Sequence, residues 1–375
     1  MNCLCSLFVL FWGMTSDLET PIERDRRRAR GAVTNSSGRF EKLERSETHD
    51  GWDTPIERDG FRTQLSYESA KSIVTRNTSP DLGFDRSINP YRGCEHGCVY
   101  CFARPTHAYL GYSAGLDFET QLIAKPNAPE LLEKTLRDRR YAVAPIAIGT
   151  NTDPYQPIER TQRIMRDCLE VLRAFKHPVG IVTKGTLIER DLDILGEMAA
   201  DGLAKVGISV TTLDVRVSRL MEPRAPTPDR RLRMIERLSA AGVPVRLMVS
   251  PVVPGLTDHE VERIIGAGAA AGAKAASWIM LRLPLEVAEL FQDWLAVHFP
   301  DRASKVMSLI RDMHGGQTYS ADWGRRMRGE GTYAELIAHR IGLAMRRTGL
   351  PKDLPPLRCD LFERPIVTGD QLSLF

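Results

Sequence analysis

Residues 89–101 of the sequence read NPYRGCEHGCVYC and place three cysteines within eight residues. These residues, Cys94, Cys98 and Cys101, have the spacing C-x3-C-x2-C. Three thiolates can hold three irons of a cubane 4Fe-4S cluster and leave the fourth iron open to a substrate or cofactor. Because a fully ligated cluster mainly carries electrons, this spacing predicts a cluster that takes part in chemistry.

A zinc site is the alternative interpretation of the same cysteines. Structural zinc usually takes four ligands, commonly as two separated pairs. His96 could be a fourth ligand, but it lies inside the same tight loop, and the chain has no second C-x2-C pair. The ligand count therefore favours an iron-sulfur cluster.

The motif, with the aromatic Tyr100 just before its last cysteine, resembles the signature of the radical S-adenosylmethionine (SAM) enzymes. The longer run through residues 102–105, FARP, resembles the branch that includes spore photoproduct lyase and a group of its bacterial homologues. The resemblance extends over about residues 86–313. It implies a 4Fe-4S cluster and SAM as cofactors, and a reduced cluster that splits SAM into methionine and a 5′-deoxyadenosyl radical for hydrogen abstraction.

From residue 88 onward, short apolar runs alternate with helical patterns. Strands are predicted near 87–89 and at 142–149, 179–183, 204–210, 243–249 and 275–281. Helices are predicted at 161–175, 189–200, 228–241, 257–271 and 286–298. Repeated βα units indicate a parallel sheet, and six of them are fewer than the eight of a closed barrel. The predicted fold class is therefore α/β, with the partial (β/α)6 TIM-like barrel that the resemblance also implies.

The chain of 375 residues divides into four predicted segments. Residues 1–81 form a polar leader, partly disordered or wrapped on the surface, and residues 82–300 form the radical SAM core. Residues 301–350 form a helical C-terminal extension, with helices at 301–313 and 333–347, and residues 351–375 form an extended tail. The apolar run at 1–12 is too short to span a bilayer and lacks signal-peptide features. We expect a start at Met14 rather than a membrane anchor.

Composition limits the remaining possibilities. The net charge of +3 creates no global field that selects nucleic acid, although local basic clusters are compatible with an anionic substrate. The cysteines outside the motif are too dispersed to hold a second cluster, which counts against methylthiotransferases and many peptide maturases. A reduced cluster needs a reducing compartment, so we expect a cytoplasmic location and an electron donor such as flavodoxin or ferredoxin.

Polar residues follow the predicted strands, at the end of the sheet where ligands bind in parallel β/α folds. Lys184, directly after the strand at 179–183, can pair a carboxylate as a point charge. By resemblance to the lyase branch, Lys184 and Ser209 contact SAM, with Thr152 as a further contact. Tyr100 by the same resemblance lies against the adenine. An exposed loop lysine and a turn hydroxyl remain the alternatives for Lys184 and Ser209.

Two further cysteines are candidates for a hydrogen-atom donor, the role that a cysteine has in spore photoproduct lyase. Cys168 shares a predicted apolar helix face with Ile164, Val171 and Phe175, so packing in the core is the favoured alternative. Cys359 lies in the predicted tail, and no motif supports it.

Residues 371–375, QLSLF, resemble the pentapeptide by which many bacterial replication and repair proteins bind the DNA sliding clamp. Leu374 and Phe375 would enter an apolar pocket of the clamp, with Leu372 beside them, and Gln371 would supply a polar contact. Docking of these apolar residues on the parent domain is the alternative.

The cluster loop and the tail together predict a radical SAM enzyme that acts on DNA, as a lyase of the repair type. Two alternatives remain open at this point. The same radical chemistry could act on RNA, a peptide or a metabolite, because fold and cofactor do not fix the substrate. The chain could also be a non-enzymatic iron-sulfur or zinc module that binds nucleic acid.

Overall fold

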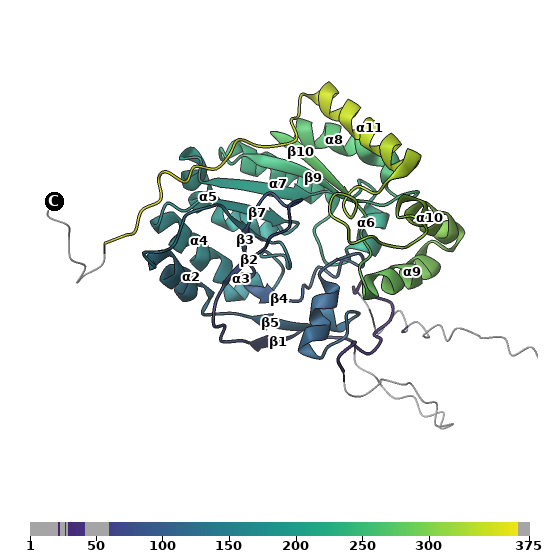
Figure 1. Cartoon of the computed structure of the whole chain (residues 1–375), viewed down its shortest axis with the longest axis horizontal. Coiled ribbons are helices and arrows are strands. Elements are labelled where there is room, and N and C mark those ends of the chain that lie inside the picture. Colours follow the sequence, from purple (N-terminus) through teal and green to yellow (C-terminus); the bar gives the residue numbers. More distant parts are fainter. Residues whose placement is uncertain (1–21, 23–26, 28, 42–59, 367–375) are drawn as a thin grey trace, which may run out of the picture.

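The computed structural model describes residues 22, 27, 29–41 and 60–366 (Figure 1). In this part of the chain, a seven-stranded sheet has the order β10-β9-β8-β7-β6-β3-β2. Its strands are β2 (Val74–Arg76), β3 (Arg86–Ile88), β6 (Ile146–Ile148), β7 (Val179–Thr183), β8 (Ala204–Ser209), β9 (Val245–Val252) and β10 (Ala275–Met280). All neighbours from β3 to β10 pair in parallel, whereas β2 is antiparallel to β3. The predicted parallel strands are therefore present.

Helices cover the sheet between successive strands (Figure 1). They are α4 (Ile164–Ala174), α5 (Leu192–Ala200), α7 (Pro228–Ala240), α8 (Val261–Ala270) and, after the last strand, α9 (Glu286–His298). Each amphipathic helix turns its apolar face toward the strands, as Cys168 and Leu172 of α4 do. One continuous hydrophobic core results between the helices and the sheet.

Several elements differ from the sequence prediction. The helix predicted at 161–175 is divided at Arg163, whose φ of 55° separates α3 (Glu159–Gln162) from α4. The strand predicted at 142–149 shortens to β6. Helices α1 (Asp117–Thr120), α2 (Ala128–Arg137) and α6 (Val215–Met221), and the 3-10 helix η1 (Arg104–Leu110), were not predicted. The helices predicted at 189–200 and 257–271 begin with the 3-10 helices η2 (Thr186–Asp191) and η3 (Asp258–Glu260).

A second, three-stranded sheet packs beside the first and has the order β1-β5-β4. It contains β1 (Gln64–Tyr67), β4 (Tyr91–Arg92) and β5 (Gln121–Ala124). Both β1 and β2 come from the segment predicted as a leader. The described residues 29–41 also pack on the core, where a Cβ on Gly31 would lie only 1.8 Å from the carbonyl oxygen of Gly97. The disorder predicted for the leader concerns residues outside the described part of the chain and stays a prediction.

The C-terminal extension contains α10 (Pro300–Met313) and α11 (Gly331–Thr348). Helix α11 lies along α8, and Arg340 pairs with Glu262 at 2.7 Å (Figure 1). The chain then runs without helix or strand to residue 366, where the described part ends. Gln371, Leu372, Leu374 and Phe375 lie outside the described residues. None of the described helices is long and apolar enough to span a membrane.

Candidate active site

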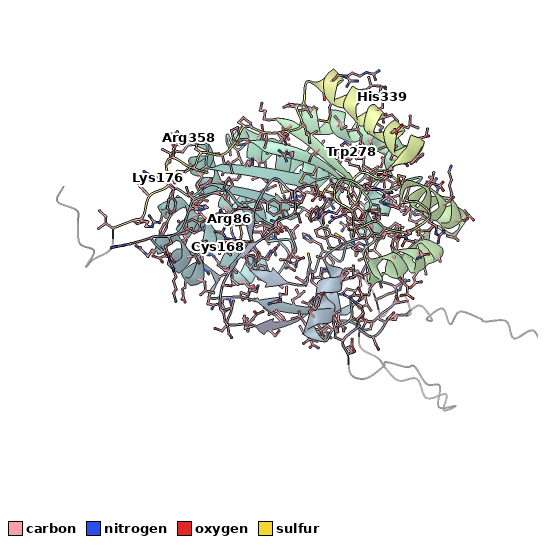
Figure 2. The ribbon with its side chains drawn as sticks, in the orientation of Figure 1. Arg86, Cys168, Lys176, Trp278, His339 and Arg358 are labelled. Carbon is pink, nitrogen blue, oxygen red and sulfur yellow. The ribbon has the colours of Figure 1, made fainter. Side chains whose placement is uncertain are left out.

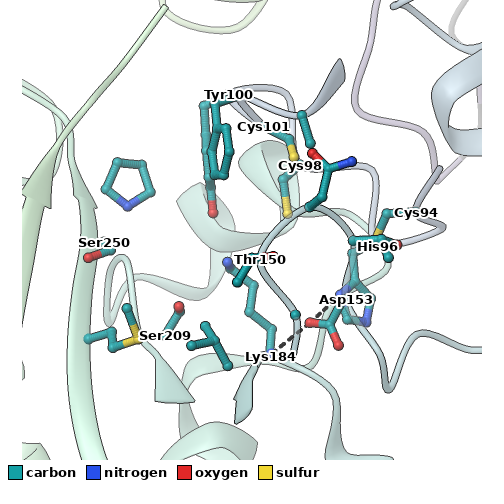
Figure 3. A pocket seen from close by; sticks show the side chains of 18 of the residues that line it. Cys94, His96, Cys98, Tyr100, Cys101, Thr150, Asp153, Lys184, Ser209 and Ser250 are labelled. Atoms are coloured by element: carbon teal, nitrogen blue, oxygen red, sulfur yellow. Dashed lines mark hydrogen bonds and ion pairs between the residues drawn. The ribbon is translucent and has the colours of Figure 1, made fainter. Parts of the chain in front are cut away.

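The carboxyl ends of the parallel strands surround a cavity of about 190 Å³. The cysteine loop forms one side, and the residues after β6 together with the carboxyl-terminal ends of β7, β8, β9 and β10 form the others (Figure 3). The lining includes every residue that the sequence predicted to hold the cluster or SAM: Cys94, Cys98, Cys101, Tyr100, Thr152, Lys184 and Ser209. The fold thus brings together side chains that are up to 115 positions apart in the sequence.

The three motif thiols face this cavity from a largely buried loop. Burial raises the pKa of the Cys94 thiol well above its ordinary value, and that of Cys98 to about 12. Neighbouring thiols contribute to both shifts, so the three groups lie close together. A thiol that coordinates a metal centre gives up its proton to the charge of the metal, so these shifts do not prevent the three thiols from acting as ligands. The donor set therefore fits a bound metal cluster.

The geometry of the thiols distinguishes a cluster from a single ion. Among the described residues, no three His, Cys, Asp or Glu side chains are placed to hold one metal ion together. The cysteines of a cubane cluster bind separate irons, so they need not converge on one point. The arrangement is compatible with the iron-sulfur interpretation.

Arg104 fixes the backbone of the cysteine loop. Its buried guanidinium donates from Nε to the carbonyl oxygen of Cys98 at 2.9 Å and from Nη2 to that of Gly97 at 3.2 Å. The same group pairs with Glu119 at 2.5 Å, and both side chains are fully buried. Glu119 also accepts hydrogen bonds from the backbone N–H groups of Gly31 and Ala32. The sequence analysis did not assign this role to Arg104.

Thr152 and Asp153 brace the loop from the end of β6. Thr152 Oγ1 donates to the carbonyl oxygen of Gly93 at 2.6 Å, so its only donor is engaged with the loop. Asp153 accepts from Thr183 Oγ1 at 2.6 Å and lies 3.3 Å from His96 Nδ1. Burial favours a raised pKa for Asp153, but His96 and the hydrogen bonds hold its pKa well below the ordinary value. These residues join the cysteine loop to two strands.

A backbone turn makes this bracing possible. Gly149, the first residue after β6, has a φ of 90°, and a Cβ there would lie 2.0 Å from the carbonyl oxygen of Val182. Only glycine allows this left-handed conformation without strain and this close passage over β7. The turn directs residues 150–153 back toward the cavity.

A largely buried network lies on another side of the cavity. Its members are Tyr100, Lys184, Glu222 and Arg231. The Tyr100 hydroxyl donates to Glu222, which also pairs with Arg231. Lys184 Nζ lies 4.0 Å from Glu222 and 5.9 Å from the centroid of the Tyr100 ring. Burial lowers the pKa of Lys184, but Cys98 and Glu222 together raise it above its ordinary value, so the amine stays charged. Figure 3 shows this amine directed toward the cysteine loop.

Neither Glu222 nor Arg231 was predicted from the sequence as part of the site. Glu222 follows α6, a helix that was not predicted. Arg231 stands in the basic run of residues 230–237, yet it is 1% exposed and also donates to the carbonyl oxygen of Ser209 at 3.1 Å. A buried arginine of this kind can be recognised only when the structure shows its carboxylate partner.

Two serines line the cavity at the ends of β8 and β9. Ser209 is buried, and its backbone is held by Arg231. The hydroxyl of Ser250 is buried and has no hydrogen-bond partner among the described residues. Buried polar groups are normally hydrogen-bonded, so an orphaned hydroxyl in a cavity wall fits a polar ligand such as SAM.

The two candidates for a hydrogen-atom donor lie elsewhere. Cys168 is fully buried in α4 among core side chains (Figure 2), and Cys359 belongs to the segment after α11. Neither residue lines the cavity. The structure therefore does not bring Cys168 or Cys359 to the candidate site. Core packing of Cys168, the favoured alternative, is confirmed.

A larger cavity of about 560 Å³ adjoins the first. Phe102, Thr150, Asn151 and Arg282 line both spaces. The second cavity extends from there toward the segment 72–92, the end of β5 and the segment between α10 and α11. A ligand in it would lie next to whatever occupies the first cavity.

Comparison with known proteins identifies the class to which this site belongs. The family model of the radical SAM superfamily matches residues 88–267. Uncharacterized protein Rv2578c of Mycobacterium tuberculosis is 40% identical over 232 residues, which are 61% of this chain and 68% of that relative. Uncharacterized protein MJ0683 of Methanocaldococcus jannaschii is 27% identical over 179 residues, 48% of this chain and 64% of the relative. The chain belongs to the radical SAM superfamily, whose members are enzymes that use a 4Fe-4S cluster and SAM.

Solved structures with a similar fold include spore photoproduct lyase. Its complex with dinucleoside spore photoproduct matches 76% of this chain and 79% of that chain, with a TM-score of 0.55 and 14% identity. A form with bound AdoMet and dinucleoside spore photoproduct matches 76% of this chain and 78% of that chain, with a TM-score of 0.50 and 16% identity. At this identity the likeness concerns the fold, and it confirms the predicted partial (β/α)6 TIM-like barrel of the radical SAM type.

Proposed function

We propose that this chain uses a single 4Fe-4S cluster to cleave SAM and to abstract a hydrogen atom from damaged DNA, as a lyase of the repair type. One observation carries the proposal: the motif thiols and the strand-end polar groups face one cavity, and this cavity adjoins a larger one with basic walls. The first feature supports the chemistry, and the second supports an anionic substrate.

Different side chains around the first cavity would bind the cluster and SAM. Cys94, Cys98 and Cys101 would hold the cluster, which when reduced supplies one electron for the cleavage of SAM into methionine and a 5′-deoxyadenosyl radical. Lys184 would pair the carboxylate of SAM as a fixed cation. Ser209 would offer its hydroxyl on the facing wall.

Two further features would support this chemistry. Glu222 holds the hydroxyl of Tyr100, which would keep the ring in place against the adenine. Met248, Ile279 and Met280 give the cavity an apolar wall. Excluding water protects a reactive intermediate from side reactions.

The DNA substrate is supported by the fold and by the tail motif. Spore photoproduct lyase, with which this chain shares its fold, has been solved in complex with dinucleoside spore photoproduct. Gln371, Leu372, Leu374 and Phe375 match a sliding-clamp motif, and we propose the bacterial clamp as a partner through these residues. A cytoplasmic location and a flavodoxin or ferredoxin as electron donor complete the proposal.

A product screen tests this function. The protein is reconstituted anaerobically with iron and sulfide, reduced, and incubated with SAM and either ultraviolet-damaged DNA or bulk RNA. The proposal predicts loss of lesions from the DNA with formation of 5′-deoxyadenosine, and no change in the RNA. The Cys98→Ala variant is the control and should do neither. Cleavage of SAM that modifies RNA and leaves damaged DNA unchanged would contradict the DNA substrate.

A further inference from the structure

We propose that the second cavity binds a single-stranded nucleic-acid segment, with Lys125 and Arg282 pairing its phosphodiester groups and Phe102 and Tyr319 contacting its bases. The inference rests on the proposed function, because it names the residues that would hold the substrate beside the first cavity. It also has a readout of its own, since binding can be measured without turnover.

The position and size of the cavity suit a substrate site. Its volume of about 560 Å³ lies in the range of about 300–1,000 Å³ that is typical of ligand sites. Phe102, which follows the last motif cysteine, and Thr150, which follows the turn at Gly149, line both cavities. A group bound in the second cavity would therefore reach the place where hydrogen abstraction occurs.

The charged side chains that line the second cavity favour an anionic ligand. Four basic side chains and no carboxylate line it among the described residues: Arg92, Lys125, Arg282 and Arg326. Two of them are already balanced, because Arg92 Nε lies 2.7 Å from Glu68 and Arg326 Nε lies 2.7 Å from Asp81. In the described part of the chain, Lys125 and Arg282 have no ion-pair partner.

Arg282 is held by a ring contact, and its N–H donors form no hydrogen bond with the described residues. Its guanidinium lies 4.2 Å over the centroid of the Phe102 ring, a cation–π contact that fixes the plane of the group. A planar guanidinium presents a fork of N–H donors that matches a phosphate. Arg282 lies on the boundary of the two cavities, so a phosphate paired with it would position the adjoining nucleotide toward the first cavity.

Lys125 offers the second cation from a different element. It follows β5, and its backbone N–H donates to the carbonyl oxygen of Pro90 at 3.0 Å, which fixes the base of the side chain. The residue is partly buried, and a partly buried ammonium without a partner is costly unless an anion pairs with it. Two cations on separate elements suit two successive phosphates along a strand.

The aromatic side chains select a nucleic acid over an acidic peptide. Phe102 is 45% exposed, and Tyr319 lines the cavity from the segment between α10 and α11. Single-stranded nucleic acids are typically bound by a basic groove with aromatic rings on which bases stack. Carboxylates of a peptide would satisfy the cations but would offer no flat ring to Tyr319 or to the part of Phe102 that Arg282 leaves exposed.

Fluorescence anisotropy of a labelled oligothymidylate of about six nucleotides, with an oligouridylate of equal length as a second probe, tests the site. Arg282→Gln and Lys125→Gln should each weaken binding by about tenfold, because each removes a charge-assisted contact. The slope of log affinity against log salt should fall by about 0.7 for each lost phosphate contact. Tyr319→Leu should weaken binding without changing that slope.

Matched controls remove a charge elsewhere. Arg139→Gln and Lys352→Gln alter exposed cations that line neither cavity, and should leave the affinity unchanged. Thermal unfolding of each variant shows whether it folds. The two substituted cavity residues lie in separate parts of the fold, so the site can still be tested with one variant if the other misfolds. Tighter binding of the oligothymidylate than of the oligouridylate would identify DNA as the source of the phosphodiester.

Three results would overturn the site: equal affinity of both cavity variants and the unmodified chain, no binding of either probe, or equal competition by an acidic peptide. The proposed radical chemistry fails separately. If the unmodified chain cleaves SAM but binds no oligonucleotide, the cavity assignment is wrong and the chemistry stands. If it binds the probe through Arg282 and Lys125 but cleaves no SAM, the site stands and the proposed function is wrong.

Discussion

The guanidinium of Arg104 donates to the carbonyl oxygen of Cys98 at 2.9 Å and so ties the middle cysteine of the motif to η1. The same buried group pairs with Glu119, which also accepts hydrogen bonds from the backbone N–H groups of residues 31 and 32. The shape of the cysteine loop therefore depends on an ion pair and on a segment far away in the sequence.

Replacing Arg104 by glutamine should destabilise the protein and its cluster. The variant leaves the buried carboxylate of Glu119 without its charged partner, which typically costs about 3–5 kcal/mol. We expect a lower melting temperature and fewer irons per chain after reconstitution. Arg233→Gln, which removes an exposed arginine paired with Asp229 on α7, is the matched control and should change little. An Arg104→Gln variant with full iron content would show that the loop does not need this clamp.

Replacing Glu222 by glutamine should weaken SAM binding. The change removes the negative partner of buried Arg231 and replaces the carboxylate that accepts from the Tyr100 hydroxyl by a neutral amide with a single acceptor oxygen, at a cost of about 3–5 kcal/mol in unfolding free energy. Equilibrium dialysis of SAM against the reconstituted protein measures the effect on binding. A Glu222→Gln/Arg231→Met double variant should recover part of the stability but not the affinity, because it relieves the unpaired charge of Arg231 without restoring the carboxylate that holds Tyr100 and lies beside Lys184. Unchanged affinity in both variants would contradict the role given to the network.

The ion pair between Asp81 and Arg326 should stabilise the protein in a pH-dependent way. Hydrogen bonds from Arg326 outweigh desolvation and lower the pKa of Asp81 below its ordinary value of 3.8. A carboxyl whose pKa is lower in the folded chain contributes its full stability above the unfolded pKa and loses it as the pH falls through the folded pKa. The pair joins the segment before β3 to the segment between α10 and α11.

Denaturant unfolding of the apoprotein measures this contribution without interference from acid release of iron. Asp81→Asn should cost about 1 kcal/mol at pH 7, and the difference from the unmodified chain should shrink once the pH falls below about 3.8. Asp353→Asn, which breaks a more exposed pair with Arg246, serves as the control. A difference that stays constant with pH would show that the charge of Asp81 does not matter.

Deleting residues 371–375 should abolish binding to the bacterial sliding clamp and leave SAM cleavage unchanged. The motif would bind through Leu374 and Phe375 in an apolar pocket, so its removal takes away the anchoring contacts. A pull-down with purified clamp, with Gln371→Ala as an intermediate variant, provides the measurement. Equal retention of the truncated chain would exclude this tail as the clamp ligand.

The sequence predicts the parallel strands and their helices well because burial imposes regular spacing on them. Cys168 and Leu172 mark the buried face of α4 at helical spacing, and β7 forms at the predicted residues. Strands β1 and β4 escape prediction because they depend on pairing with β5 rather than on a local pattern. Tyr91 and Arg92, two residues beside the motif, form β4 only because β5 returns beside them.

The residues of the site also fall into two groups, those that the sequence indicates and those that only the structure reveals. Lys184 can be located because it directly follows β7, and Ser209 because it ends β8, and the sheet topology carries both to one cavity. Glu222 and Arg231 cannot be recognised in the sequence, because each is buried only through the other and α6 has no strong pattern. Ser250 follows the same strand-end rule as Ser209 and could have been named from it.

The formation of 5′-deoxyadenosine tests the central claim most directly. The protein is reconstituted anaerobically, reduced, supplied with SAM, and assayed by mass spectrometry beside Cys98→Ala. We predict about four irons and four sulfides per unmodified chain together with 5′-deoxyadenosine and methionine, and neither cluster nor products in the variant. A chain that binds zinc and leaves SAM intact, or a Cys98→Ala variant that still forms 5′-deoxyadenosine, would contradict the account.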